Sequence, residues 1–346
     1  MRISGSIKSV LPIAVATLLL SACNSAVSMV SDAMQPSSQE RQTAAPKTSG
    51  FKTEVDTAKA FAGKRDVVIG GFKVSFVTRE KSSSKPRGGL LSGPSVARAA
   101  AETYLADVPN EMMQAITDAA YADFKAQLKA QGYNVRPFSF LTGNKTFNGA
   151  TTKASPLKST EPMPAMNADA LIFAPSGQKL RLFAVQGDGV QAYGWGSPEA
   201  SFSQAAAELG VPVLDAFYVV DFTDFDGYSS RTTAAMSVGQ MLKVIKGDLY
   251  ITAGQGGTFS TNQGRISLAE WVYSEAQFCS IEKREKSGAG KVGSVLATGM
   301  SVLLGGGTRS FDEFDFKADA GKYRAIATTN LTNANAALIG KMAALR

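Results

Sequence analysis

The amino-acid sequence predicts an α/β protein, in which helices pack on one mixed β-sheet and the C-terminal region adds strands and a terminal helix. Three observations lead to this prediction. Two helical segments each pass through a glycine, Gly132 or Gly210, into an apolar strand. Further strand-like segments follow residue 234, and a long helical pattern over 319–345 closes the chain. Helical crossovers of this kind place strands in parallel, whereas strands joined by short turns are antiparallel.

The amino-acid composition excludes several kinds of catalytic and metal site but does not identify a function. The chain has 346 residues, 44% of them hydrophobic, and a formal net charge of +7. This hydrophobic content is close to the globular average, so we expect a packed core. There is no histidine and there are only two cysteines. A Ser-His-Asp or Cys-His catalytic arrangement and a His-ligated zinc site are therefore excluded.

The first 22 residues have the pattern of a cleaved signal peptide. Arg2 and Lys8 precede the short apolar stretch Val10–Leu20, and the segment closes on Leu-Ser-Ala-Cys at Cys23. The apolar stretch is shorter than the about 20 residues that a membrane-spanning helix needs. The closing tetrapeptide resembles a lipobox, which predicts lipidation (palmitate) at Cys23. Asn24 favours the outer membrane, facing the periplasm, over retention in the inner membrane.

The chain divides into four predicted parts. A signal peptide occupies residues 1–22, and residues 23–65 are the lipidated cysteine and a flexible tether, poor in large apolar residues after Cys23. An α/β domain spans 66–255, with an inserted loop and hairpin over 142–195. Residues 256–346 form a C-terminal extension that we expect to pack on the same body.

The first half of the α/β domain yields one strong helix. Pro109 suits a helix start, and Met112, Ile116, Ala120, Phe124 and Leu128 then recur every fourth residue. This pattern predicts a helix over 109–131. We also predict the following elements: a strand over 67–77, a polar loop over 79–95, a helix over 96–105 and a strand over 133–141.

The second half carries the strongest strand pattern. A hairpin is predicted from 168–174 and 179–186, joined at Pro-Ser-Gly. A helix over 198–209 follows, with Ser197 as its N-cap and Gly210 as its C-cap. It leads into the apolar run Val213–Phe222.

The remaining segments are predicted mainly as strands. Residues 234–245 and 249–253 read as two strands linked by a turn at Lys-Gly-Asp. Residues 266–281 are rich in Val, Tyr, Trp and Phe and continue as strand, with a helix as the alternative up to Phe278. A second confident helix covers 319–345, where most apolar positions lie three or four apart.

The order of elements over about 66–255 resembles the α/β module shared by the curli-secretion lipoprotein CsgG, the penicillin-binding-protein activator LpoB and the N-terminal domain of TolB. The matching features are an opening strand that ends near Phe72 or Phe76, the helix end Leu128-x-x-x-Gly132-Tyr133-x-Val135, and a helix leading through Gly210 to a long strand. The resemblance implies a binding or assembly protein without catalytic residues.

Asp221, Asp224 and Asp226 form the densest carboxylate cluster in the chain and are the candidate binding residues. A calcium loop of EF-hand type requires an oxygen ligand where Phe222 stands, so no metal site is predicted. Asp221 and Asp224 also differ in strand parity, which points them to opposite faces of a regular strand. Cys279 lies in a strand-like pattern and reads as a small buried hydrophobe.

These patterns predict a non-enzymatic, lipid-anchored envelope protein that binds a protein or an anionic envelope polymer, with no cofactor. Its other predicted partner is the membrane, through the N-terminal lipid, and nucleic acid is not expected outside the cytoplasm. One alternative is a homo-oligomeric secretion-channel or pore subunit, with strands from 234–259 and 266–281. Another is an enzyme that uses the carboxylates of Asp221 and Asp224.

Overall fold

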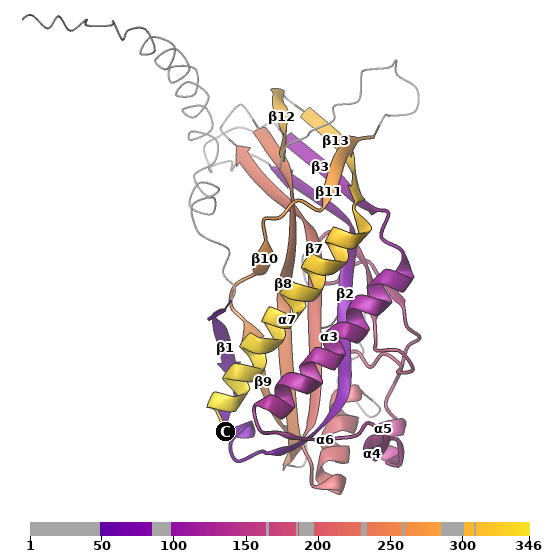
Figure 1. Cartoon of the computed structure of the whole chain (residues 1–346), viewed down its shortest axis with the longest axis vertical. Helices are drawn as coiled ribbons and strands as arrows, with labels where there is room; N and C mark the ends of the chain where they lie inside the picture. The colour runs from indigo at the N-terminus through magenta and orange to yellow at the C-terminus, as the bar shows by residue number, and fades with distance from the viewer. Residues whose placement is uncertain are drawn as a thin grey trace, which may run out of the picture. The chain divides into compact units, whose positions relative to one another are not determined.

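A mixed β-sheet organises the computed structural model of the chain (Figure 1). The structure describes residues 49–84, 98–163, 166–184, 186, 197–229, 234–257, 260–284, 301–307 and 309–346. All of these residues belong to the unit Pro46–Arg346. The described residues place 13 strands in the sheet, with helices packed on it, which confirms the predicted fold class.

Three long strands build the centre of the sheet: β2 (Asp66–Ser84), β7 (Val213–Ser229) and β8 (Ala234–Gly257). β2 and β7 are parallel, and β8 returns antiparallel to β7. The short strand β4 (Asn134–Arg136) pairs in parallel with the start of β2. The first halves of β2 and β7 are buried on both faces, which explains their nearly continuous apolar sequences. The predicted crossovers and antiparallel return are confirmed.

Two long helices, α3 (Asn110–Ala130) and α7 (Ala320–Ala344), lie side by side across one face of the sheet (Figure 1). Asp319 caps α7, because its carboxylate accepts a hydrogen bond from the Lys322 amide at 3.0 Å. Both helix predictions are confirmed to within one or two residues. Within the part of the chain that the structure describes, no helix has the length and apolarity needed to cross a membrane.

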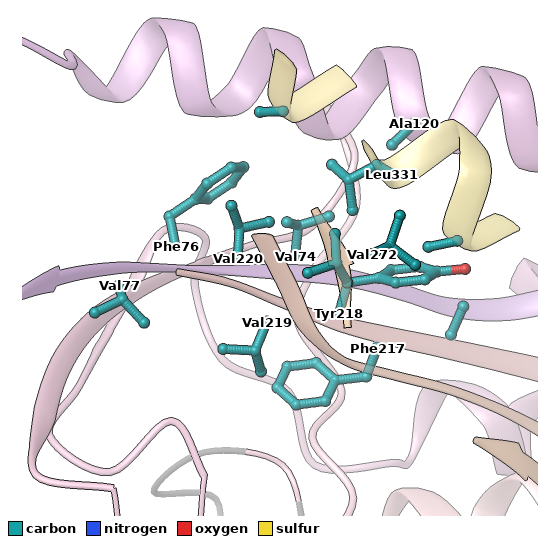
Figure 2. Packing of buried hydrophobic residues seen from close by; sticks show 14 of the residues in the cluster. Val74, Phe76, Val77, Ala120, Phe217, Tyr218, Val219, Val220, Val272 and Leu331 are labelled. Atoms are coloured by element: carbon teal, nitrogen blue, oxygen red, sulfur yellow. The ribbon is translucent and has the colours of Figure 1, made fainter. Parts of the chain in front are cut away.

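The main core lies between these helices and the sheet. Figure 2 shows Phe76, Tyr218 and Val220 on the side of the strands that faces the helices, and Phe217 and Val219 on the other side. This alternation is the expected period of two along a strand. Each of these five residues is at most 1% exposed to solvent.

Asn335 joins three elements at the centre of this core. Its side chain accepts a hydrogen bond from the Tyr218 hydroxyl at 2.6 Å. Its amide nitrogen donates to the Ala120 carbonyl at 3.0 Å and to the Asp123 carboxylate at 2.8 Å. Asn335 is fully buried, so these bonds tie α7 both to α3 and to β7.

Replacing Asn335 with Leu is expected to lower the free energy of unfolding by about 2–4 kcal/mol, because the buried Tyr218 hydroxyl loses its acceptor, and the Ala120 carbonyl and the Asp123 carboxylate each lose one donor. Urea unfolding of wild type and variant measures this loss. Asn333→Leu, a half-buried position on the same helix, is the matched control and should change stability by less than about 0.5 kcal/mol. Equal effects at the two positions would contradict a role for the buried hydrogen bonds.

The opposite face of the sheet carries a second, smaller core. Here lie α4 (Ser139–Thr142), α5 (Lys145–Asn148) and α6 (Pro198–Leu209). Val213 packs in this core whereas the next residue, Leu214, packs in the first, as expected for successive residues of a strand. The largest side chains of the second core are Phe147, Phe183, Phe202 and Tyr250.

The predicted helix over 198–209 is confirmed together with its caps. The Ser197 hydroxyl accepts a hydrogen bond from the Ala200 amide at 3.2 Å, which satisfies one free donor of the first turn. Gly210 ends the helix with φ of 66°, a left-handed conformation that glycine adopts without strain.

Segments from both ends of the chain extend the sheet. On one side, β3 (Arg98–Ala106) pairs antiparallel with β2, β13 (Arg309–Ala318) pairs in parallel with β3, and β11 (Cys279–Lys283) pairs antiparallel with β13. On the other side, β9 (Ser260–Leu268) pairs with β8, and β1 (Thr53–Asp56) pairs with β9. The sheet path is therefore β1-β9-β8-β7-β2-β3-β13-β11.

Five short strands lie off this path, among them β4, which pairs with β2. β10 (Val272–Ser274) and β12 (Ser301–Gly307) pair with β8. β6 (Ala168–Phe173) pairs with β2, and β5 (Leu157–Ser159) pairs with β6. Residues 256–346 thus supply strands to the same sheet as residues 66–255.

Several predicted elements are wrong. The helix over 96–105 is instead β3, whose alanines pair with neighbouring strands on both sides. The loop predicted over 79–95 is wrong for residues 79–84, which belong to β2; residues 85–97 lie outside the described part. Residues 53–60, assigned to the tether, form β1 and a 3-10 helix, Ala58–Ala60.

The predicted hairpin is also wrong. β6 pairs with β2 rather than with 179–186, where Leu180 makes only an isolated bridge with Lys153. The strand predicted over 133–141 is limited to β4, since α4 begins at Ser139. The two strands predicted over 234–245 and 249–253 are one strand, β8, without the expected turn.

Candidate functional site

The three candidate aspartates all lie on β7, but they do not converge. Asp221 faces Lys243 across the strand pair, Asp224 faces Gly239 and Asp226 faces Ser237. Asp221 is buried, whereas Asp224 and Asp226 are half-buried. No group of three or more acidic, cysteine or histidine side chains among the described residues could hold a metal ion.

Asp221 belongs to a buried charge cluster. Its carboxylate lies 3.2 Å from the Lys243 ammonium, and it accepts a hydrogen bond from the Phe222 amide at 2.7 Å. Lys243 also donates to the Thr223 carbonyl and lies 4.4 Å from the centre of the Trp271 ring. These contacts satisfy both charges inside the protein, so Asp221 holds strands together rather than facing a ligand.

Glu80 extends this cluster from β2, and sequence reasoning missed it. Its carboxylate accepts a hydrogen bond from the Thr223 hydroxyl. Burial, together with the nearby charge of Asp221, raises the pKa of Glu80 to about 8. Glu80 therefore holds its proton at neutral pH, which allows two buried carboxyl groups to lie beside a single lysine.

A second buried pair lies on the α6 face of the sheet. The Lys73 ammonium contacts the Asp215 carboxylate directly, and both side chains are within 1% of complete burial. Lys73 also donates to the Arg181 carbonyl at 2.8 Å, and Gln186 donates to Asp215 at 2.9 Å. Burial lowers the pKa of Lys73 and raises that of Asp215, whereas their contact opposes both shifts.

This pair is enclosed by aromatic and polar groups. The Lys73 ammonium lies 5.2 Å from the Phe183 ring centre. Nearby, the Glu199 carboxylate accepts a hydrogen bond from the Ala184 amide at 2.6 Å. Burial raises the pKa of Glu199. Perturbed pKa values in a cleft often mark a catalytic site. Here, however, the charges of Lys73 and Asp215 pair with each other and hydrogen-bond to buried neighbours, which indicates a structural ion pair.

An open concave site lies elsewhere, between α3 and the segment around β4, and has a volume of about 400 Å³. We call it the α3–β4 pocket. It is lined by Tyr121, Lys125 and Lys129 of α3, by residues 135–138, and by Ile69 and Gln178. Its volume falls within the range of small-molecule pockets, about 300–1,000 Å³.

The charge of the α3–β4 pocket is positive. Lys125, Lys129 and Arg136 contribute three cations, and its lining includes no carboxylate among the described residues. Asp66, outside the lining, lies 3.1 Å from the Arg136 guanidinium, and both side chains are about half exposed. Burial raises the pKa of Tyr121, so the phenol stays protonated at neutral pH. The positive charge of the pocket therefore suits binding of an anion.

The two cysteines differ in what the structure says about them. Cys23 lies outside the described residues. Cys279 begins β11, where its amide donates a hydrogen bond to the Gln240 side chain at 3.0 Å. Burial raises the pKa of the Cys279 thiol to about 12, so it is not a reactive thiolate.

Sequence reasoning missed the α3–β4 pocket because its cations lie at ordinary helical spacing. Lys125 and Lys129 look like a solvated helix face until β4 is placed against them. The buried pair carried a clearer signal: Lys73 and Asp215 are single charges inside apolar strands. A charge at such a position requires a buried partner of opposite sign.

Comparison with known proteins finds no family model, no curated protein and no solved structure that matches this chain. The resemblance to the module of CsgG, LpoB and TolB therefore stays a prediction.

Proposed function

We propose that this chain is a non-enzymatic, lipid-anchored protein of the bacterial cell envelope that binds an envelope partner. The observation that carries the proposal is the α3–β4 pocket. It offers cations and aromatic walls on a helix and a strand, and its described lining has no carboxylate or thiol. Binding sites of this kind are concave and largely apolar, with a few polar groups that fix orientation.

The proposed anchor is Cys23, which follows the lipobox-like Leu-Ser-Ala. A protein tethered by a lipid at its N-terminus meets polyanionic surfaces of the envelope. Residues 23–346, without Arg2 and Lys8 of the signal peptide, carry a formal net charge of +5 and are attracted to them. We assign the membrane contact to the lipid and the partner contact to the α3–β4 pocket.

Replacing Cys23 with Ser is expected to abolish incorporation of labelled palmitate and to move the protein from the membrane fraction to the soluble fraction. Cys279→Ser, the matched control at the other cysteine of the chain, should keep the label because that residue lies in a folded strand. An unlabelled wild-type protein, or equal labelling of the two variants, would contradict the proposed anchor.

Partner binding is tested by crosslinking in whole cells, followed by recovery of the tagged chain. We expect wild type to recover a partner that Lys125→Glu/Lys129→Glu does not. Lys52→Glu/Lys59→Glu, at exposed positions outside the pocket, makes the same charge change and should keep the partner. Equal recovery by both double variants would contradict binding through the pocket.

A subunit of an oligomeric channel stays the alternative prediction. Native mass spectrometry of the detergent-solubilised chain separates the two, since a channel subunit requires a homo-oligomer and the proposed function does not.

A further inference from the structure

Lys125 and Lys129 of the α3–β4 pocket have no anionic partner among the described residues. Lys125 and Lys129 lie one helical turn apart, a rise of about 6 Å along the axis. Neither forms an ion pair with any carboxylate in the described part of the chain. Positions four residues before and after Lys125 hold Tyr121 and Lys129, so no acidic neighbour on the helix offsets either charge.

The third cation approaches from the other wall. Arg136 of β4 lines the same pocket, and its guanidinium is held by Asp66 at 3.1 Å. Three cations thus share one nearby carboxylate, which leaves a positive excess around the cavity. An anionic group placed between the two walls would meet lysines on one side and a guanidinium on the other, and charge-assisted hydrogen bonds of this type are the strong ones.

The apolar walls of the pocket are held in place before any ligand arrives. The Tyr121 ring packs against Phe72 with centroids 5.4 Å apart, and the Phe138 ring packs edge-on against Phe147 at 5.9 Å. Ile69 lines the pocket and is only 2% exposed. A small inorganic anion has no apolar surface to bury against these walls, whereas a ligand with an apolar ring face can bury that face there.

The pocket also holds a neutral hydrogen-bonding group. The Gln178 side chain lines the cavity and hydrogen-bonds the Tyr121 hydroxyl. An amide carries both donors and an acceptor, so Gln178 can bind hydroxyl groups as well. The walls therefore combine cations, aromatic rings and an amide within about 400 Å³.

We propose that the α3–β4 pocket binds an anionic saccharide unit, a sugar ring that bears a carboxylate or a phosphate. The ring's apolar face lies on Phe138, its hydroxyl groups meet Gln178, and its anionic group lies between Lys125, Lys129 and Arg136. The Lys125 ammonium lies 4.2 Å from the centre of the Tyr121 ring, which holds this cation at the pocket. This inference rests on the proposed function and names the chemistry of its partner. The same unit can be a free sugar or part of an envelope polymer.

Titration calorimetry of the full chain in detergent tests this assignment with four probes: glucuronic acid, glucose 1-phosphate, glucose and inorganic phosphate. We expect both anionic sugars to bind with Kd of about 1 mM or below, and at least tenfold tighter than glucose or phosphate alone. An oligosaccharide of uronic acid units that binds tighter than the single sugar identifies a polymer as the source. Equal affinities identify a free sugar.

Variants separate the parts of the site. Lys125→Ala/Lys129→Ala should weaken binding of the anionic sugars at least tenfold, whereas Lys52→Ala/Lys59→Ala should leave it unchanged. Phe138→Leu should weaken binding of the sugars, with no effect on phosphate. Thermal unfolding of each variant verifies that it folds. If Phe138→Leu does not fold, the two lysine double variants still test the assignment.

Three results would overturn the inference: no binding of either anionic sugar, equal binding of inorganic phosphate and glucose 1-phosphate, or sugar binding that is insensitive to Lys125→Ala/Lys129→Ala. The crosslinking experiment in cells can give a negative result independently of the saccharide-binding experiment. If Lys125→Ala/Lys129→Ala loses saccharide binding while Lys125→Glu/Lys129→Glu still recovers the envelope partner, the role of the pocket in the proposed function is refuted and the saccharide site remains in place.

Discussion

Replacing Asp215 with Asn, or Lys73 with Met, is expected to lower the free energy of unfolding by about 3–5 kcal/mol, because each change leaves one buried charge without its partner. Both side chains are within 1% of complete burial, so water cannot replace the lost contact. Chemical denaturation at pH 7 measures the loss.

The double variant Lys73→Met/Asp215→Leu is the informative control. It removes both charges, so it should lose less stability than either single variant. Lys317→Gln breaks an exposed ion pair with Glu282 and should leave unfolding unchanged within error. Single variants that unfold like wild type would contradict a stabilising role of the buried pair.

The steric setting of Asp215 gives an independent check. Gly71 lies beside it on β2, and a Cβ atom at that position would come within 1.9 Å of the Asp215 carboxylate. Gly71→Ala therefore pushes the carboxylate away from Lys73, and we expect a loss of stability comparable to that of Asp215→Asn. The glycine serves close approach of the carboxylate, which the sequence alone does not reveal.

Replacing Glu80 with Gln is expected to stabilise the protein at pH 8 and to flatten its stability against pH. The folded pKa of Glu80 is about 8, above the unfolded value of a glutamate, so the folded state keeps a proton that the unfolded state releases. The free energy of unfolding therefore falls as pH rises from the unfolded pKa of Glu80 to its folded pKa, by up to about 1.4 kcal/mol per pH unit from this group. Gln carries no such proton, so the variant lacks this slope.

Urea unfolding of wild type and Glu80→Gln from pH 5 to pH 9 tests this expectation. The difference between the two curves isolates Glu80, because all other titrating groups are shared. Glu54→Gln, an exposed glutamate on β1, is the matched control and should follow the wild-type curve. A difference between wild type and Glu80→Gln that does not grow with pH would show that Glu80 is charged in the folded protein.

The elements predicted correctly are those whose signals are local. The helix over 198–209 starts at a hydroxyl cap and ends at a glycine, and both act within one turn of the chain. α3 and α7 repeat apolar residues at helical spacing, and β2 and β7 are nearly continuous apolar runs. Each pattern can be read without knowing its neighbours.

The wrong predictions concern segments whose neighbours decide their conformation. Residues 98–106 contain four alanines in nine residues and favour a helix by propensity alone, yet β2 and β13 pair with them on both sides. Gly247 was read as a turn but lies inside β8. A side chain there would come within 2.7 Å of Leu268, so this glycine permits close packing instead.

The sequence by itself determined the absence of histidine chemistry, the lipobox-like start, the long helices and the parallel strands at the centre of a mixed sheet. Composition and periodicity carry this information residue by residue. Only the tertiary structure decided that Asp221 forms an ion pair with Lys243, that Lys73 forms one with Asp215, and that two helical lysines and Arg136 line the same pocket. The physical reason is that ion pairing, burial and cavity shape depend on contacts between residues far apart in the chain.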